Sequence, residues 1–202
     1  MASVLSQPVT TVAPPVLAAA PRRFALGYAV VLAIFATSPF WLSAVGLYQY
    51  LALEVLIWRM YALGYNLLLG YGGLPSFGHG AFFGIGAYAA GLALKHADAG
   101  LLAGMAAAIA AAATLGALVA AFISHRRGIY YALMTIAFGQ LAWFVSIKWH
   151  SVTGGEDGLL NIPRPPLDLG FVQVSLSSHA ALFYFALVLF AVIAWVLWYL
   201  ID

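Results

Sequence analysis

Cysteine and charge are what this chain lacks most. It has no cysteine, which excludes a disulfide framework, a thiolate metal site and a cysteine nucleophile. Only 7% of its 202 residues are charged, whereas a soluble domain carries roughly a quarter. The formal net charge of +2 is too small to indicate nucleic acid as a partner. Apolar residues instead make up 65% of the chain, at a mean hydropathy of +1.00, and this composition predicts an integral membrane protein.

The first 22 residues differ in composition from the rest. They hold four prolines, contain no long apolar core and begin without a basic region. A signal peptide would have both a basic region and a long apolar core. Residues 1–22 are therefore predicted to be a flexible cytoplasmic tail.

From residue 23 onward, long apolar runs alternate with short charged or glycine-containing segments, which predicts an all-α polytopic transmembrane bundle of about six spans. The run from 24 to 70 is long enough for two crossings, with a turn near 46–49. Further spans are expected at about 77–94, 101–124, 128–147 and 180–201, with a loop at about 148–178 before the last one.

A glycine-rich stretch organises the middle of the chain. Gly72, Gly73 and Pro75 predict a broken helix around residues 70–76, because proline lacks an amide donor and paired glycines favour turns. Ser76 is expected to cap the helix that follows. Irregular backbone inside a membrane is tolerated only beside protein or a water-filled cavity, so the break indicates a translocation path. A plain cytoplasmic turn remains the alternative.

Polar residues and glycines near the break are the candidates for a substrate pathway: Asn66, Gly72, Gly73, Ser76, His79 and Gln140. Each polar one also has a structural interpretation: capping for Ser76, packing at a helix start for His79, and hydrogen bonding between helices for Asn66 and Gln140. Gly80 and Gly84 lie four residues apart, the spacing that lets two membrane helices pack closely.

Basic residues predict the orientation. Arginine pairs at 22–23 and 126–127 fall on one side of six alternating spans, which makes that side, and both termini, cytoplasmic. The loop at 148–178 then lies outside. Its glycine-rich part is expected to be a solvated turn or a docking surface, and comprises Thr153, Gly154, Gly155, Glu156 and Asp157.

Two stretches together resemble the LivM-type permeases of bacterial branched-chain amino acid ABC importers. The first, at 66–88, reads NLLLGYGGLPSFGHGAFFGIGAY; the second is RGIYYALMT at 127–135, with TGGEDG at 153–158 downstream. The resemblance covers about residues 50–200. It implies that residues 23–202 are a partial permease domain in the bacterial inner membrane, on a path for branched-chain, aliphatic amino acids. It also implies a transporter subunit without a cofactor or metal of its own, and not an enzyme.

The resemblance also implies partners: a LivH-type second permease, two cytoplasmic ATPase subunits that hydrolyse ATP, and a periplasmic substrate-binding protein facing the loop at 148–178. Such permeases usually continue past the last span into a cytoplasmic coupling loop and further helices. This chain stops at Asp202, so it is expected to be C-terminally truncated or a fragment.

Three alternatives stay open at this point. A urea or short-chain amide importer has close sequences and relies equally on its binding protein for selectivity. An intramembrane hydrolase would use Ser76 and His79, three apart, as nucleophile and base, although no orienting third residue or G-x-S-x-G context accompanies them. A structural membrane subunit would have no pathway at all.

Overall fold

The computed structural model describes residues 23–42, 46, 48–97, 99–126, 128–168 and 173–201, so the expected tail at 1–22 lies outside the described residues. The long helices of this part are α1 (Arg23–Leu42), α2 (Gln49–Asn66), α3 (His79–His96), α4 (Leu101–Ile123), α5 (Ile129–Lys148) and α7 (His179–Ile201). The shorter elements are a π-helical turn η1 (Leu67–Tyr71), helix α6 (His150–Thr153), a 3₁₀ turn η2 (Gly155–Asp157) and the antiparallel strands β1 (Leu167–Asp168) and β2 (Gln173–Val174).

The predicted class, an all-α membrane bundle, is confirmed. Four helices of the described part are long and apolar enough to cross a membrane, at Tyr50–Tyr71, Leu101–Ile123, Ile129–Lys148 and His179–Ile201. A shorter apolar helix covers Gly27–Leu42, and six of the 18 residues of α3 are glycine or histidine, which lowers its hydropathy. The expected number of about six spans is therefore approximate.

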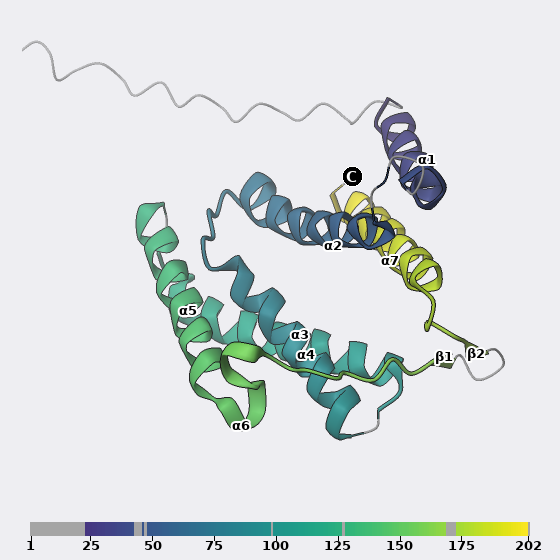
Figure 1. Cartoon of the computed structure of the whole chain (residues 1–202). Helices are drawn as coiled ribbons and strands as arrows, with labels where there is room; N and C mark the ends of the chain where they lie inside the picture. The colour runs from purple at the N-terminus through teal and green to yellow at the C-terminus, as the bar shows by residue number, and fades with distance from the viewer. Residues whose placement is uncertain are drawn as a thin grey trace, which may run out of the picture.

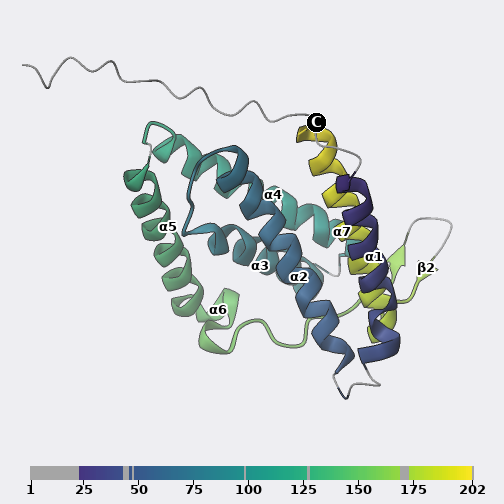
Figure 2. The same ribbon diagram turned by 90° about the horizontal axis from the view of Figure 1, so that it is seen from above.

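Helices α1, α2 and α7 form one group, which Figure 2 shows with α1 and α7 side by side. Two tyrosines join these two helices: the Tyr28 hydroxyl donates to the Ala191 carbonyl at 2.9 Å, and the Tyr184 hydroxyl to the Ala36 carbonyl at 3.3 Å. Leu56 of α2 is fully buried between them. The shared core comprises Phe35, Leu42, Ala52, Leu53, Leu56, Phe183, Ala186 and Phe190.

Arg59, a charged residue of α2, contacts the core that α1, α2 and α7 share. The sequence places Glu54 and Arg59 about 140° apart around a helix, so they cannot pair with each other. In the structure the Arg59 guanidinium lies 4.6 Å from the ring centroid of Phe35 on α1. A cation over an aromatic face is attracted by the ring quadrupole, so Arg59 helps to attach α1 to α2.

Helices α3, α4 and α5 form the second group, with small residues where α3 meets α4. A Cβ atom on Gly86 would lie 3.6 Å from the Ala108 carbonyl oxygen, and one on Gly104 would lie 3.1 Å from the Leu94 side chain. At the other end of α4, Val119 and Ile123 are buried against Tyr131 of α5. At one end of this group, α3 and α4 therefore pack with their backbones close together, and at the other end α4 and α5 pack through large side chains.

The loop before α7 returns along the α3–α4 pair, as the extended strand of chain between α6 and β1 in Figure 1 shows. The Lys95 ammonium at the end of α3 donates to the Leu160 carbonyl at 3.0 Å. A Cβ atom on Gly91 would lie 3.2 Å from Ile162, so the loop also packs on the side of α3. The loop and the C-terminal end of α3 consequently share one end of the bundle.

Candidate functional site at the helix break and the α3–α5 cleft

Helix α2 ends in a wider turn before it breaks. The amide of Gly72 donates to the Leu67 carbonyl at 3.2 Å, a five-residue π-type step, and the amide of Leu74 donates to the Leu68 carbonyl at 3.1 Å. Gly73 has a φ of +61°, in the left-handed region that glycine adopts without strain. Regular helix resumes only at His79. The predicted Gly/Pro break is thus confirmed, and π-type turns are frequent at functional sites.

The far side of the break packs directly against the backbone of α5. The amide of Phe77 donates to the Thr135 hydroxyl at 3.1 Å, and that hydroxyl donates in turn to the Ala132 carbonyl at 2.7 Å. A Cβ atom on Gly78 would overlap the Thr135 carbonyl, and one on Gly139 would lie 3.0 Å from the Cα atom of Gly78. Only glycine at both positions permits this contact.

The contact lies well inside the span. Thr135 and Gly139 are the seventh and eleventh residues of α5. At 1.5 Å per residue they lie ~9 and ~15 Å from its start, so Gly78 meets the middle of the helix. Neither Gly139 nor Thr135 was among the site residues expected from the sequence. A glycine in the middle of an apolar span was the signal that was available.

The predicted cap of α3 is wrong. Ser76 makes no capping hydrogen bond, its hydroxyl oxygen has no partner within the described part of the chain, and Gly78 is the N-cap residue. The reason is the contact with α5, which holds Phe77 and Gly78 in a turn and moves the helix start to His79. Ser76 then lies two residues too early to reach the first free amides of the helix. Its side chain is only 2% exposed.

His79 fills the junction between α2 and α3. Its ring lies 5.1 Å from that of Tyr61, 5.7 Å from that of Tyr65 and 6.1 Å from that of Phe82, between centroids. A Cβ atom on Gly64 would lie 3.5 Å from its Nε2 atom. The Nδ1 atom is buried and has no hydrogen-bond partner among the described residues. His79 thus packs in an aromatic cage with one nitrogen unsatisfied.

The remaining pathway candidates near the break are exposed. Asn66 lies against Gly70, where a Cβ atom would be 3.0 Å from its Oδ1 atom. A Cβ atom on Gly72 would lie 2.6 Å from the Leu68 carbonyl oxygen, whereas the space beside Gly73 is open. None of these three lines either of the two cavities described next.

Beyond the Gly78 contact, α3 and α5 separate and leave a cavity on each side of the seam between them. The first, of about 510 Å³, includes Gln140 and is called here the polar cleft. Its lining comprises Phe77, Gly78, Gly80, Ala81, Gly84, Ile85, Tyr88, Ile136, Gly139, Gln140, Ala142, Trp143 and Ser146. A carboxamide donates and accepts hydrogen bonds, and Gly80 and Gly84 leave backbone uncovered on the facing helix.

These two glycines contact no helix closely in the described part of the chain. A Cβ atom on Gly80 would lie 4.0 Å from the Tyr61 hydroxyl, and nothing lies within 4 Å of one on Gly84. Their predicted role in helix packing stays a prediction.

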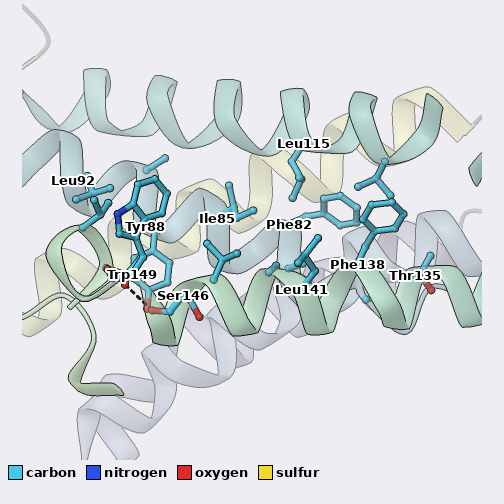
Figure 3. A pocket seen from close by; sticks show the side chains of 18 residues that line it. Phe82, Ile85, Tyr88, Leu92, Leu115, Thr135, Phe138, Leu141, Ser146 and Trp149 are labelled. Carbon is cyan, nitrogen blue, oxygen red and sulfur yellow. Dashed lines mark hydrogen bonds between the residues drawn. The ribbon is translucent and has the colours of Figure 1, made fainter. Parts of the chain in front are cut away.

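The second cavity, of about 410 Å³, lies between α3, α4 and α5 and is called here the apolar slot (Figure 3). Figure 3 shows Tyr88 and Trp149 at one end and Phe138 and Thr135 at the other, with Ile85 and Leu141 between. Both cavities border the same seam, and they share the lining residues Gly78, Ala81, Ile85, Tyr88, Ala142 and Ser146.

The predicted docking loop is a compact turn that closes one end of the slot. Thr153 is buried, and its hydroxyl lies 2.6 Å from the Ser146 carbonyl and 2.7 Å from the Trp149 carbonyl. The amide of Gly155 donates to the same hydroxyl at 3.3 Å. Gly154 has a φ of +81°, which favours glycine. Glu156 and Asp157 are exposed on this turn and free to face water or a partner surface.

Comparisons with known proteins agree with this architecture. A family model described as "Branched-chain amino acid transport system / permease component" matches residues 47–200. Two proteins named "High-affinity branched-chain amino acid transport system permease protein LivM" are similar to the chain over 117 residues: that of Salmonella typhimurium LT2 is 29% identical and that of Escherichia coli K12 is 31% identical. The match covers 58% of this chain and 28% of each relative. No solved structure matches.

The family match covers most of the described residues, including the helix break, the polar cleft and the glycine-rich turn. It extends over more than half of the chain, which is enough to assign the family. The chain belongs to the family of permease components of branched-chain amino acid transport systems.

Proposed function

We propose that the chain is the permease subunit of an ABC importer in the bacterial inner membrane and forms part of the path for branched-chain, aliphatic amino acids. The observation that supports this best is the helix break held at the middle of α5, beside the polar cleft that contains Gln140. Broken helices inside a membrane serve substrate sites because they present free backbone groups to a cavity near the middle of the bilayer.

The polar cleft suits an amphipathic solute. The Gln140 amide offers hydrogen bonds to a carboxylate or an ammonium group, while Ile85, Ile136 and Ala142 supply an apolar wall for an aliphatic side chain. Ser76 and His79 add two buried polar atoms that have no partner among the described residues, and a rearrangement of the break would expose them to a passing solute. Asn66, Gly72 and Gly73 would act on the cytoplasmic side of the break, where they are exposed.

The proposal requires partners. Import by this mechanism needs two cytoplasmic ATPases that move the membrane helices, a LivH-type second permease and a periplasmic binding protein. The turn at Thr153–Asp157 is the proposed docking surface for the binding protein, because hydrogen bonds of Thr153 attach it to the end of α5 and it carries two exposed carboxylates. Residues 1–22 and the turn at 124–128 would face the ATPases.

The uptake experiment tests the pathway. The chain, reconstituted in proteoliposomes with a LivH-type permease, the ATPases and the binding protein, is expected to import leucine when ATP is supplied. Gln140→Met keeps the shape but removes the hydrogen bonds, and should lower uptake about tenfold, the effect of one hydrogen bond to a charged group. Met134→Gln, on the same helix but outside both cavities, should leave uptake unchanged. Import of urea or a short amide in place of leucine would contradict the proposed substrate class.

The proposed orientation has its own test. Because the chain has no cysteine, single cysteines are introduced on a clean background. Ala97→Cys and Glu156→Cys should both react with an impermeant thiol reagent from outside, since Lys95 and Leu160 join these segments at one end of the bundle. Ser124→Cys should react only after the cytoplasmic side is opened. Labelling of positions 97 and 156 from opposite sides would refute the orientation.

A further inference from the structure

The apolar slot offers no free hydrogen-bond donor along most of its length. Besides the Tyr88 hydroxyl at one end, three hydroxyl groups line it, and each donates to a nearby main-chain carbonyl. Thr135 donates to Ala132 at 2.7 Å, Ser146 donates to Trp143 at 2.8 Å, and the hydroxyl of Thr153 lies 2.6 Å from the Ser146 carbonyl. A zwitterionic amino acid would lose its hydration there without gaining partners, which is costly. The slot therefore fits a hydrocarbon chain better than the transported solute.

The dimensions of the slot point the same way. Its α5 lining runs from Thr135 to Trp149. These fourteen residue steps span ~21 Å at 1.5 Å each. A volume of about 410 Å³ spread over that length leaves a mean cross-section of ~20 Å², which admits one extended alkyl chain and excludes two side by side. The slot is thus long, narrow and lined mainly by apolar groups.

Its two ends differ in chemistry. Phe82, Leu115 and Phe138 close the deep end (Figure 3). Tyr88 and Trp149 occupy the other end, at the last turn of α5, where Lys148 is exposed. Tyrosine and tryptophan prefer the membrane–water interface, because one end of each side chain is apolar and the other is polar. The end of the slot at Tyr88 and Trp149 therefore lies at the level of the lipid headgroups.

We propose that the apolar slot binds one acyl chain of a membrane phospholipid, with the headgroup at Tyr88 and Trp149 and the chain end between Phe82 and Phe138. The chain enters from the leaflet on the side of the loop at 149–168, and the ~21 Å slot extends a little beyond the ~15 Å hydrocarbon depth of that leaflet. By filling the gap between α3 and α5, this lipid supports their separation without a protein side chain. This site does not depend on the proposed transport activity.

Photo-crosslinking tests the proposal. The full chain in membranes is exposed to phosphatidylglycerol or phosphatidylethanolamine that carries a diazirine at a chosen acyl carbon. A diazirine near the headgroup should label peptides containing Tyr88 or Trp149, and one near the chain end should label peptides containing Phe82 or Phe138. Labelling confined to lipid-facing residues such as Val188 and Trp195 on α7 would overturn the proposal.

A matched pair of variants on α3 separates slot binding from general contact with lipid. Ala89 lines the slot, whereas Ala87 is exposed and lines neither cavity. Ala89→Phe should lower slot labelling about tenfold, the loss expected when roughly two methylene groups of the lipid no longer fit. Ala87→Phe should leave it unchanged. Ala89→Leu is a smaller change and should give an intermediate loss of labelling. It replaces Ala89→Phe as the test if that variant does not fold.

Two further labelling experiments identify the molecule that occupies the slot. A diazirine-bearing free palmitic acid should label the slot more weakly than the phospholipid, because it lacks the headgroup that the Tyr88 and Trp149 end would hold. Excess leucine should not reduce the labelling. Stronger labelling by the free acid would assign the slot to fatty acids, and protection by leucine would assign it to the transported solute; either result would overturn the proposal.

Discussion

Gly78→Ala is expected to reduce uptake by about two orders of magnitude, the consequence of ~3 kcal/mol of misfit in a packed core. The added methyl group would overlap the Thr135 carbonyl, and a main-chain atom in the middle of α5 has no rotamer by which to move away. The break would have to withdraw from α5, which would break the hydrogen bond from Phe77 and reshape the polar cleft. Uptake by reconstituted proteoliposomes is the measurement.

Gly116→Ala on α4 is the matched control, because it makes the same change at a position that lines neither cavity and where nothing lies within 4 Å of the new atom. The amount of each variant in the membrane is measured beside uptake, so that a loss of transport is separated from a loss of the protein. Normal uptake by Gly78→Ala would mean that the close contact with α5 has no part in transport.

Thr135→Val is expected to destabilise the protein by about 1–3 kcal/mol, the usual cost of leaving a buried donor without its acceptor. Valine keeps the shape and the burial of threonine but removes the oxygen that accepts from the Phe77 amide at 3.1 Å. Thr135→Ser keeps the oxygen and loses only a methyl group, so it should recover most of the stability. The measurement is thermal inactivation of the purified chain in detergent, followed by uptake.

The two substitutions at position 135 separate hydrogen bonding from packing. If serine is as damaging as valine, the methyl group matters more than the hydroxyl, and Thr135 holds the break by packing alone. Recovery by serine of both stability and uptake would support the hydrogen bond as the link between the break and α5.

Local signals in the sequence were sufficient to predict the helices and the break. Pro75 and the glycine pair before it act on their own backbone, so the failure of the helix between Tyr71 and His79 required no knowledge of the fold. The glycine-rich turn after Thr153 was likewise recognisable as a turn. That Thr153 itself is buried and hydrogen-bonded was not predicted, because its partners are the carbonyls at the end of α5.

Contacts between distant residues were beyond the sequence pattern. Phe77 and Thr135 are 58 positions apart, and nothing in the periodicity of either span pairs them. The same contact explains why the cap predicted for Ser76 is absent, since a tertiary constraint displaced the helix start by two residues. The apolar slot and the polar cleft result from the separation of α3 and α5 and have no linear signature. For the same reason, the depth of the break in the membrane could not be predicted from the sequence.

The depth of Phe77 in the bilayer tests the central claim most directly. Phe77 is 68% exposed in the described part of the chain, so a spin label attached through Phe77→Cys should be tolerated. Its collision rates with oxygen and with a water-soluble nickel complex report depth, and Gln140→Cys and Ser124→Cys provide the references for mid-span and interface. We expect the label at 77 to match that at 140, because the break packs against the middle of α5. A depth equal to that at 124 would show that the break is a plain cytoplasmic turn and would contradict its place in the pathway.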